Sequence, residues 1–333
     1  MKTLVNNGKV QVRAVEAQAL LREATEDGRY QGGKWGGLYL RAPEVYFRVL
    51  EMAGSKLVQL KEVAEVRFGI KTGANDFFYL EPLPYRPTCP LCGCVHEEAL
   101  TAEEERAWRE RREEPPEDTL VAVKNGMGWE GYLEYAYLAP TWRRAEELED
   151  GLLVPPARLL AAPSSVSSRH LGAYLSEGVA DGLTSRKSVR GRRSWWAIPI
   201  PPPPPIILPA GVHDAYHHWE NPGPWQIDKR LYGVYPRQGV SEKALAVALG
   251  SPITQASLEY GVRMGLGGGL ADLTVYEYQE CRIPHPSLVP GLSTTMGEWA
   301  HKLALPEEVL KKLASALQQS ITGRLGRARG GVG

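Results

Sequence analysis

The spacing of apolar residues along the chain predicts amphipathic helices that alternate with short strands. Apolar side chains recur one helical turn apart in five segments, namely residues 17–24, 43–52, 241–249, 251–264 and 306–321. Pro43 and the pair Ser251-Pro252 begin two of these segments, where helices favour a first-turn proline and a capping serine. We therefore expect a helix in each segment.

Strands are expected where apolar residues alternate or form short continuous runs. Such runs occupy residues 8–15, 66–68, 120–139, 152–161 and 206–208. Residues 273–278 fit either a strand or the start of a helix. Together the two patterns predict an α/β (α+β) fold, in which a mixed sheet of short strands packs against helices.

A polar loop interrupts the apolar pattern between residues 60 and 80, just before a run of aromatic residues. Gly69 and Gly73 permit a positive φ or a close approach by another segment. Thr72, Asn75 and Asp76 offer short polar side chains that fix a turn or reach a ligand. The loop is therefore either an ordinary turn between strands or a rigid ligand-binding loop.

The composition is that of a globular protein. The chain has 333 residues, enough for one large or two ordinary domains, with 43% apolar and 23% charged residues. No run approaches the roughly 20 apolar residues that a membrane helix needs, and the first residues lack the apolar core of a signal peptide. We therefore expect a cytoplasmic protein with no membrane partner.

Charge is balanced over the whole chain but segregated along it. The 39 basic residues equal the 39 acidic residues in number. Residues 185–193, here called the basic segment, contain no acid and hold Arg186, Lys187, Arg190, Arg192 and Arg193. Local basic patches contact phosphates whatever the total charge. The basic segment is thus either a nucleic-acid contact or a solvated surface.

Three further segments have biased compositions. Residues 97–117 are densely charged around a single tryptophan, Trp108, which predicts an exposed helix with many salt bridges. Proline dominates residues 199–205 and indicates a stiff, extended connection. The glycine- and arginine-rich end from Gly323 predicts a mobile tail.

Four metal-ligand side chains stand close together in the sequence, namely Cys89, Cys92, Cys94 and His96. The first two have the spacing of a zinc knuckle, but structural zinc sites usually take their second pair a dozen or more residues away. Cys281 and His285, or one of the scattered histidines, would have to supply that pair. Zinc binding by Cys89, Cys92, Cys94 and His96 is therefore a hypothesis, beside reduced surface cysteines or a local disulfide.

Two stretches in order along the chain carry a family resemblance. Lys34-Trp35-Gly36-Gly37-Leu38-Tyr39-Leu40-Arg41-Ala42-Pro43 and then Gly69-Ile70-Lys71-Thr72-Gly73-Ala74-Asn75-Asp76-Phe77-Phe78 resemble the junction between the catalytic and target recognition domains of adenine-N6 DNA methyltransferases, including type IIG restriction-modification enzymes. Arg193-Ser194-Trp195-Trp196 and residues 244–284 resemble later landmarks of the same recognition domain. The resemblance spans residues 32–286.

The resemblance implies a domain organisation. Residues 1–55 would be the boundary segment at the end of a methyltransferase domain. Residues 56–290 would form a target recognition domain, with the cysteine-containing and charged residues 82–118 inserted. Residues 291–333 would hold the C-terminal helix and the tail.

It also implies recognition of a specific sequence in double-stranded DNA. Lys71, Thr72 and Asn75 occupy the place where the family's recognition loop approaches DNA, and Arg263 stands beside a Gly-rich turn near DNA. The basic segment would contact phosphates or guanine edges. Trp195 and Trp196 are expected in the core.

Catalytic motifs of the family are not found in this chain. The Asn/Asp-Pro-Pro-Tyr/Phe tetrapeptide that accepts a flipped adenine has only a poor counterpart at 221–225, and the glycines at 265–269 lack a preceding strand. We therefore expect no cofactor here apart from zinc, with S-adenosylmethionine bound by a separate catalytic domain or subunit docked at residues 1–33 or 306–321. The alternatives are a divergent active methyltransferase or nuclease, and a zinc-stabilised protein-interaction module.

Overall fold

The chain forms two compact units that are interleaved in sequence. The computed structural model describes residues 2–6, 11–23, 25–26, 29–30, 35–264, 270–289 and 294–330. Unit 1 consists of Met1–Arg67, Leu208–Trp219 and Val234–Gly333, and unit 2 of Phe68–Ile207 and Glu220–Gly233. Each unit gathers separate stretches of sequence, and the expected domain boundaries at residues 55 and 290 stay a prediction.

Each passage of the chain from one unit to the other falls inside a strand. The strands concerned are β6 (Ala64–Phe68), β12 (Ile206–Pro209), β14 (Trp219–Glu220) and β16 (Leu231–Pro236). The predicted buried strand at 206–208 corresponds to β12, and Ile206, Ile207 and Leu208 are buried as expected from their continuous apolar run.

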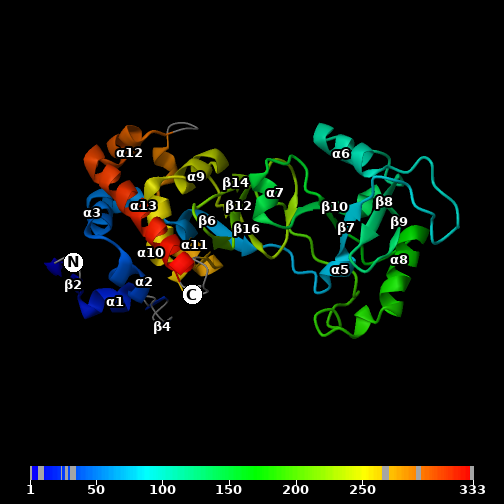
Figure 1. Cartoon of the computed structure of the whole chain (residues 1–333), viewed down its shortest axis with the longest axis horizontal. Helices are drawn as coiled ribbons and strands as arrows, with labels where there is room; N and C mark the ends of the chain where they lie inside the picture. Colours follow the sequence, from blue (N-terminus) through cyan, green and yellow to red (C-terminus); the bar gives the residue numbers. More distant parts are fainter. Residues whose placement is uncertain are drawn as a thin grey trace. The chain divides into compact units, whose positions relative to one another are not determined.

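Unit 1 is mainly helical (Figure 1). Its helices are α1 (Ala17–Glu23), α2 (Trp35–Arg41), α3 (Glu44–Ala53), η1 (Gly54–Lys56), α4 (Leu60–Val63), α9 (Glu242–Leu249), α10 (Pro252–Gly261), α11 (Val275–Glu280), η4 (Pro286–Leu288), α12 (Met296–Leu303) and α13 (Glu307–Gly330). Its short strands are β1 (Lys2–Asn6), β2 (Gln11–Ala14), β3 (Thr25–Glu26), β4 (Arg29–Tyr30), β5 (Leu57–Gln59), β13 (Gly211–Val212), β17 (Arg263–Met264), β18 (Ala271–Asp272) and β19 (Arg282–Pro284). They form small sheets, such as the antiparallel pair β5 and β19.

The core of unit 1 lies where α3, α10, α12 and α13 meet. Figure 1 shows α13, in red, crossing α10. Ser251 caps α10 by accepting a hydrogen bond from the Thr254 backbone N–H at 3.2 Å, and Pro252 occupies its first turn. The predicted helices over 43–52 and 241–249 are confirmed as α3 and α9. The helix predicted over 251–264 ends earlier, at Gly261.

The tail prediction is wrong for residues 323–330, because α13 continues through them to Gly330. Arg324 is 3% exposed and donates from Nη1 to the carbonyl oxygen of Val212 at 3.2 Å. Its Nη2 lies 3.4 Å from the fully buried carboxylate of Glu259, to which Ser320 also donates at 2.8 Å. These contacts hold this part of α13 against the rest of unit 1.

Unit 2 is built on a six-stranded sheet with the order β15-β10-β11-β7-β8-β9. The strands are β7 (Tyr79–Pro82), β8 (Leu120–Asn125), β9 (Glu130–Glu134), β10 (Leu138–Trp142), β11 (Ala157–Leu160) and β15 (Gln226–Ile227), and the helices are α5 (Asn75–Phe78), α6 (Ala102–Arg111), η2 (Tyr135–Tyr137), α7 (Ala145–Glu149), α8 (Arg169–Ala180) and η3 (Leu183–Ser185). Neighbouring strands are antiparallel, except that β10 and β15 run parallel.

Side chains alternate between the two faces of this sheet, as the pleat requires. Val121 and Val123 of β8 join Leu133 in one core, against which α8 packs through Leu171 and Tyr174. Ala122 joins a second, smaller core on the other face. The predicted α/β (α+β) class with mixed sheets is confirmed by this architecture together with the helical unit 1. No helix among the described residues is long and apolar enough to cross a membrane.

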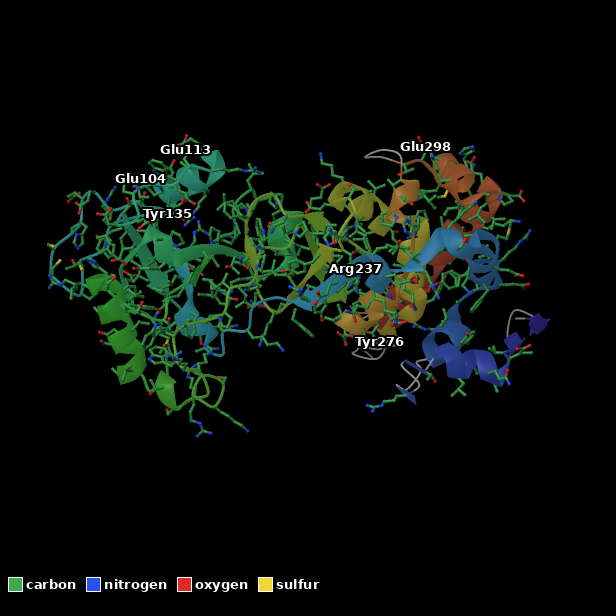
Figure 2. The ribbon with its side chains drawn as sticks, turned by 180° about the vertical axis from the view of Figure 1, so that it is seen from behind. Glu104, Glu113, Tyr135, Arg237, Tyr276 and Glu298 are labelled. Carbon is green, nitrogen blue, oxygen red and sulfur yellow. The ribbon has the colours of Figure 1, made fainter. Side chains whose placement is uncertain are left out.

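The densely charged run forms α6, which is shorter than the predicted segment 97–117 and is not exposed throughout. Its N-terminus has a capping box, in which Glu104 accepts from the Thr101 backbone N–H at 2.8 Å. Glu104 and Glu113 lie on the outer side of this region (Figure 2). Glu105, in contrast, is fully buried and forms an ion pair with the buried Arg158 of β11.

Replacing Glu105 with Gln is expected to lower the free energy of unfolding by about 3–5 kcal/mol at pH 7, because the Arg158 guanidinium then stays buried without a counter-charge. Urea unfolding followed by tryptophan fluorescence measures the change. Glu110→Gln, at an exposed position on the same helix, is the matched control and should change it by less than about 0.5 kcal/mol.

The effect of Glu105→Gln should also depend on pH. Burial raises the pKa of Glu105, but the hydrogen bonds and charges of Arg158 and Arg109 together outweigh burial and hold that pKa below its usual value. Such a carboxylate stabilises the fold above its unfolded-state pKa of about 4.3, and the contribution is lost as pH falls through the folded-state pKa. The stability gap between wild type and variant should therefore narrow below about pH 4. A gap that stays constant would contradict this assignment.

Candidate nucleic-acid interface and cysteine–histidine cluster

The predicted recognition loop is held by a close approach of two backbone segments within unit 2. Gly69 donates its N–H to the Leu231 carbonyl oxygen at 3.0 Å, and Ile70 donates to that of Ile227 at 2.7 Å. A Cβ atom at Gly69 would lie 2.2 Å from the Asp228 carbonyl oxygen. Only glycine fits this position, because any side chain would overlap the neighbouring backbone.

The side chain of Asp228 stabilises this close approach of the two backbone segments. It is fully buried, accepts a hydrogen bond from the Tyr79 hydroxyl at 2.8 Å and pairs with Arg230 Nε at 2.9 Å. Burial and the Asp228 charge raise the pKa of the Tyr79 phenol, so that it stays a donor. The guanidinium of Arg143 lies over the Tyr79 ring, 4.4 Å from its centre. These contacts therefore fix the position of the backbone at the start of the loop that follows Gly69.

Within the loop, the predicted side chains have different surroundings. Thr72 is 1% exposed; its hydroxyl donates to Asn75 Oδ1 and accepts from the Ala74 backbone N–H at 3.2 Å. Asn75 is half-buried at the start of α5. Lys71 is exposed, with its Nζ 4.8 Å from the centre of the Phe68 ring. Thr72 therefore shapes the turn, while Lys71 presents its charge to solvent.

The structure brings the basic segment onto this loop. Ser188 donates from its hydroxyl to the Gly73 carbonyl oxygen at 2.7 Å, and Arg192 donates to that of Thr72. The Arg192 guanidinium also lies 5.6 Å from the centre of the Phe78 ring. Gly73 has a φ of 80°, which glycine adopts without strain. The two segments that sequence alone assigned to DNA contact are thus neighbours.

Four cations of the basic segment face solvent, namely Arg186, Lys187, Arg190 and Arg193. Among the residues that the structure describes, none of these four forms an ion pair. Arg192 differs because it is half-buried against the loop. Sequence reasoning missed Lys229, an exposed cation whose backbone N–H donates to the Ile70 carbonyl oxygen at 3.0 Å. Arg263 begins β17, but its side chain lies outside the described part of the structure.

The tryptophans after the basic segment were expected in the core, but both are only half-buried and pack against its edge. Trp195 lies with its ring centre 5.4 Å from that of Phe77 in α5. A Cβ atom at Gly178 of α8 would lie 2.4 Å from the Trp195 ring, so the helix touches the indole directly. Trp196 donates from Nε1 to the Pro163 carbonyl oxygen at 2.9 Å. These contacts anchor the end of the basic segment on the core of unit 2.

The predicted metal ligands gather at a tight turn elsewhere in unit 2. The Gly93 N–H donates to the Cys89 carbonyl oxygen at 2.8 Å, and the Cys89 N–H donates to that of Cys94 at 2.8 Å. Gly93 has a φ of 74°, in the left-handed region that favours glycine. Cys89 is buried, while Cys92 and Cys94 are exposed with their Sγ atoms 2.6 Å apart. Cys92 Sγ lies 3.5 Å from His96 Nε2.

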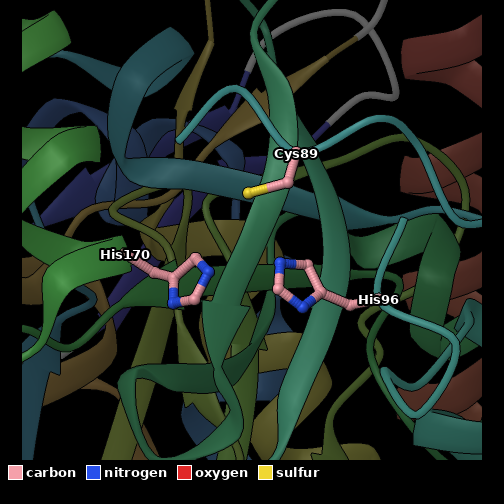
Figure 3. A group of neighbouring side chains, drawn as sticks. All are labelled: Cys89, His96 and His170. Atoms are coloured by element: carbon pink, nitrogen blue, oxygen red, sulfur yellow. The ribbon is translucent and has the colours of Figure 1, made fainter. Parts of the chain in front are cut away.

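The structure adds a fifth side chain, His170 of α8, which sequence reasoning did not single out. Ligand atoms of Cys89, His96 and His170 lie within 4.8 Å of one another, as do those of Cys92, Cys94 and His96. Figure 3 shows the Cys89 thiol and the two imidazole rings pointing toward a common space. His170 is one of the scattered histidines left open by the sequence. Cys281, in contrast, is buried in unit 1, and His285 bonds Ser287 through Nδ1 at 2.7 Å.

The surroundings of these groups favour the forms that bind metal ions. Burial lowers the pKa of His170, which keeps its imidazole neutral. Hydrogen bonding by the Cys94 thiol lowers the pKa of Cys92 to about 7, so a large share of Cys92 is thiolate at neutral pH. The thiolate and the neutral imidazole are the ligand forms of these residues.

Comparison with known proteins identifies the family. The sequence profile of the C-terminal domain of the type II methyltransferase M.Eco57I matches residues 148–317. The chain belongs to this family, and the resemblance to the C-terminal domain of a type II methyltransferase is confirmed. No curated protein sequence matches the chain.

One solved structure is similar over much of the chain. It is described as the crystal structure of the type IIG restriction endonuclease BpuSI, with a TM-score of 0.49 and 12% sequence identity. The similarity covers 86% of this chain and 34% of that one. The chain thus spans about a third of the length of BpuSI.

Gly69→Ala is expected to lower the free energy of unfolding by about 3 kcal/mol or more, because the added methyl group overlaps the Asp228 backbone and neither segment can move alone. Thermal unfolding of the purified chain measures the effect. Gly172→Ala is the matched control: a Cβ atom there meets nothing within 4 Å, and alanine in a helix should leave stability unchanged or raise it by up to about 1 kcal/mol. Equal effects of the two substitutions would contradict the close approach at Gly69.

Proposed function

We propose that this chain is the DNA-recognition part of a type II restriction-modification methyltransferase of the adenine-N6 class. In this role it reads a short sequence in duplex DNA and holds that DNA for a catalytic domain or subunit outside this chain. S-adenosylmethionine is then bound by that catalytic part. Family membership supports the general context, and the type IIG architecture is the arrangement that we favour within it.

The observation that carries the proposal is the joining of the basic segment to the loop at residues 71–76. Lys71, Arg186, Lys187, Arg190 and Arg193 are exposed on these two segments. Two hydrogen bonds between the segments, from Ser188 and Arg192, hold them together. Cations on a fixed backbone keep a constant spacing, which is what register on a phosphate backbone requires.

A cation that is paired with an acidic side chain of the same protein is less available to bind phosphate. The buried arginine Arg158 is neutralised by Glu105, and the exposed Arg67 by Glu65 at 2.5 Å. Among the described residues, the exposed cations of the basic segment have no acidic partner and can therefore bind an external anion. Arginine and lysine in such positions bind phosphate oxygens, and arginine also reads guanine in the major groove.

Selection from a randomised duplex DNA pool tests the proposal. The purified chain is incubated with the pool at low and at moderate salt, and the bound fraction is sequenced. Enrichment of one short motif is expected, with binding that weakens steeply as salt rises because phosphate contacts release counterions. Salt-dependent binding without an enriched motif would contradict sequence recognition, and the absence of salt-dependent binding would overturn the DNA role.

The double variant Lys187→Ala/Arg190→Ala should bind the selected duplex more weakly. If each side chain contacts one phosphate, the slope of log K against log salt should become shallower by roughly 2, because each lost contact contributes about 0.9. Fluorescence anisotropy over a salt series measures the slope. Arg106→Ala removes an exposed cation from α6 in the same unit and should leave the slope unchanged; a similar loss in this control would indicate a nonspecific effect of total charge.

A further inference from the structure

We propose that Cys89, Cys92, His96 and His170 bind one structural zinc ion that ties the loop around residues 89–96 to helix α8. Two cysteines and two histidines form a common donor set for tetrahedral zinc. Here the first three ligands come from a single turn and the fourth from a helix far along the sequence. The metal would therefore join two segments of unit 2.

The turn presents its ligands in the way that a zinc knuckle does. Its backbone is closed by the hydrogen bond from Gly93 to Cys89, and the left-handed φ of Gly93 reverses the chain directly after Cys92. Both cysteines therefore stand on one tight loop. A zinc–sulfur bond of about 2.3 Å and a zinc–nitrogen bond of about 2.0 Å separate tetrahedral sulfur and nitrogen ligands by about 3.5 Å. Cys92 Sγ and His96 Nε2 are 3.5 Å apart.

A separate observation, on His170 of α8, indicates a ligand from outside the knuckle. Its Nε2 atom is buried and forms no hydrogen bond within the described part of the chain. A buried ring nitrogen without a hydrogen bond is costly, and a metal ion satisfies it. The ring centres of His170 and His96 are 5.3 Å apart and their planes are inclined by 75°, so that the two rings share one space with the Cys89 thiol (Figure 3).

The other nitrogen of each histidine faces a carboxylate. His96 Nδ1 lies 3.5 Å from Glu98 Oε1, and His170 Nδ1 lies 3.8 Å from Glu134 Oε1. In metal sites, a carboxylate on the far nitrogen fixes the tautomer and orients the ring. The same arrangement on both rings leaves their Nε2 atoms free to bind the metal ion.

Cys94 is the nearby thiol that the proposal leaves out of the ligand set. It offers a competing set with Cys92 and His96. Cys92 belongs to that exposed set and not to the group of Cys89, His96 and His170, so the proposed site requires Cys92 Sγ to turn from Cys94 toward the buried Cys89 thiol and the two imidazoles. A pocket lined by Cys89, Pro90 and His170, among others, opens beside the cluster and gives a metal ion access to it.

Metal analysis of the full chain, purified under reducing conditions without chelator, tests the site. About one zinc per chain is expected by mass spectrometry of the metal content. Removal of the zinc should lower the melting temperature by about 5 °C or more, and added zinc should restore it. A chain that contains no zinc and takes up none when zinc chloride is added would overturn the proposal.

Variants identify the ligands. His170→Ala should lose the zinc, whereas His301→Ala, at an exposed position on α12, should keep it. His170→Cys replaces one ligand by another and should retain zinc, which separates loss of a ligand from loss of the fold. Cys92→Ala should lose zinc and Cys94→Ala should keep it. Zinc retained by His170→Ala but lost by Cys94→Ala would overturn the assignment in favour of the local set.

The cobalt(II) form gives a readout that does not depend on stability. Cobalt bound to two thiolates in tetrahedral geometry shows intense visible absorption with a sulfur charge-transfer band. This spectrum is expected for the wild type, for Cys94→Ala and for His301→Ala. A wild-type spectrum typical of octahedral cobalt, without thiolate bands, would contradict the four-ligand site.

Discussion

The contact between the backbones at Gly69 and Asp228 is the constraint on which the architecture of unit 2 depends. It joins the segment that enters β7 to the segment between β15 and β16. The buried carboxylate of Asp228 accepts a hydrogen bond from the Tyr79 hydroxyl, and its backbone N–H donates to the Trp142 carbonyl oxygen at 2.8 Å. Because the site tolerates no side-chain atom at Gly69, the start of the loop at residues 71–76 has a fixed position relative to the sheet.

Helix α8 connects the two parts of unit 2 to which we assign roles. Its first turn holds His170 in the cysteine–histidine cluster. One turn later, Tyr174 stacks on Phe77 with ring centres 4.4 Å apart and donates its hydroxyl to the Phe77 carbonyl oxygen at 2.6 Å. Its last turns touch Trp195, just beyond the basic segment. A constraint on one end of this helix therefore reaches the loop and the basic segment through packed aromatic side chains.

Local signals predicted well the features that depend on neighbouring residues. Ser251 and Pro252 marked the start of α10, and the glycines of the loop marked a place of close approach. Features that depend on distant partners were missed. Glu105 looks like any other acid in a charged run, because nothing near it reveals that Arg158 neutralises it in the core. Arg324 lies in a glycine-rich stretch that predicts a mobile tail, yet its side chain donates a hydrogen bond to the distant Val212 carbonyl oxygen. His170 gave no spacing signal, although its place one turn before a core tyrosine would have put it on the inner face of a helix.

The interleaving of the two units has a consequence for how such a chain can recombine with a related one. The Leu208–Trp219 segment of unit 1 interrupts unit 2, and every junction lies inside a hydrogen-bonded strand rather than in a loop. A single genetic crossover within this region would give a hybrid whose strands come from different parents on either side of the break. Recombination that preserves both cores would have to replace residues 68–233 together, carrying along the interrupting segment, whereas point substitutions on the exposed loop leave every strand with its original partners.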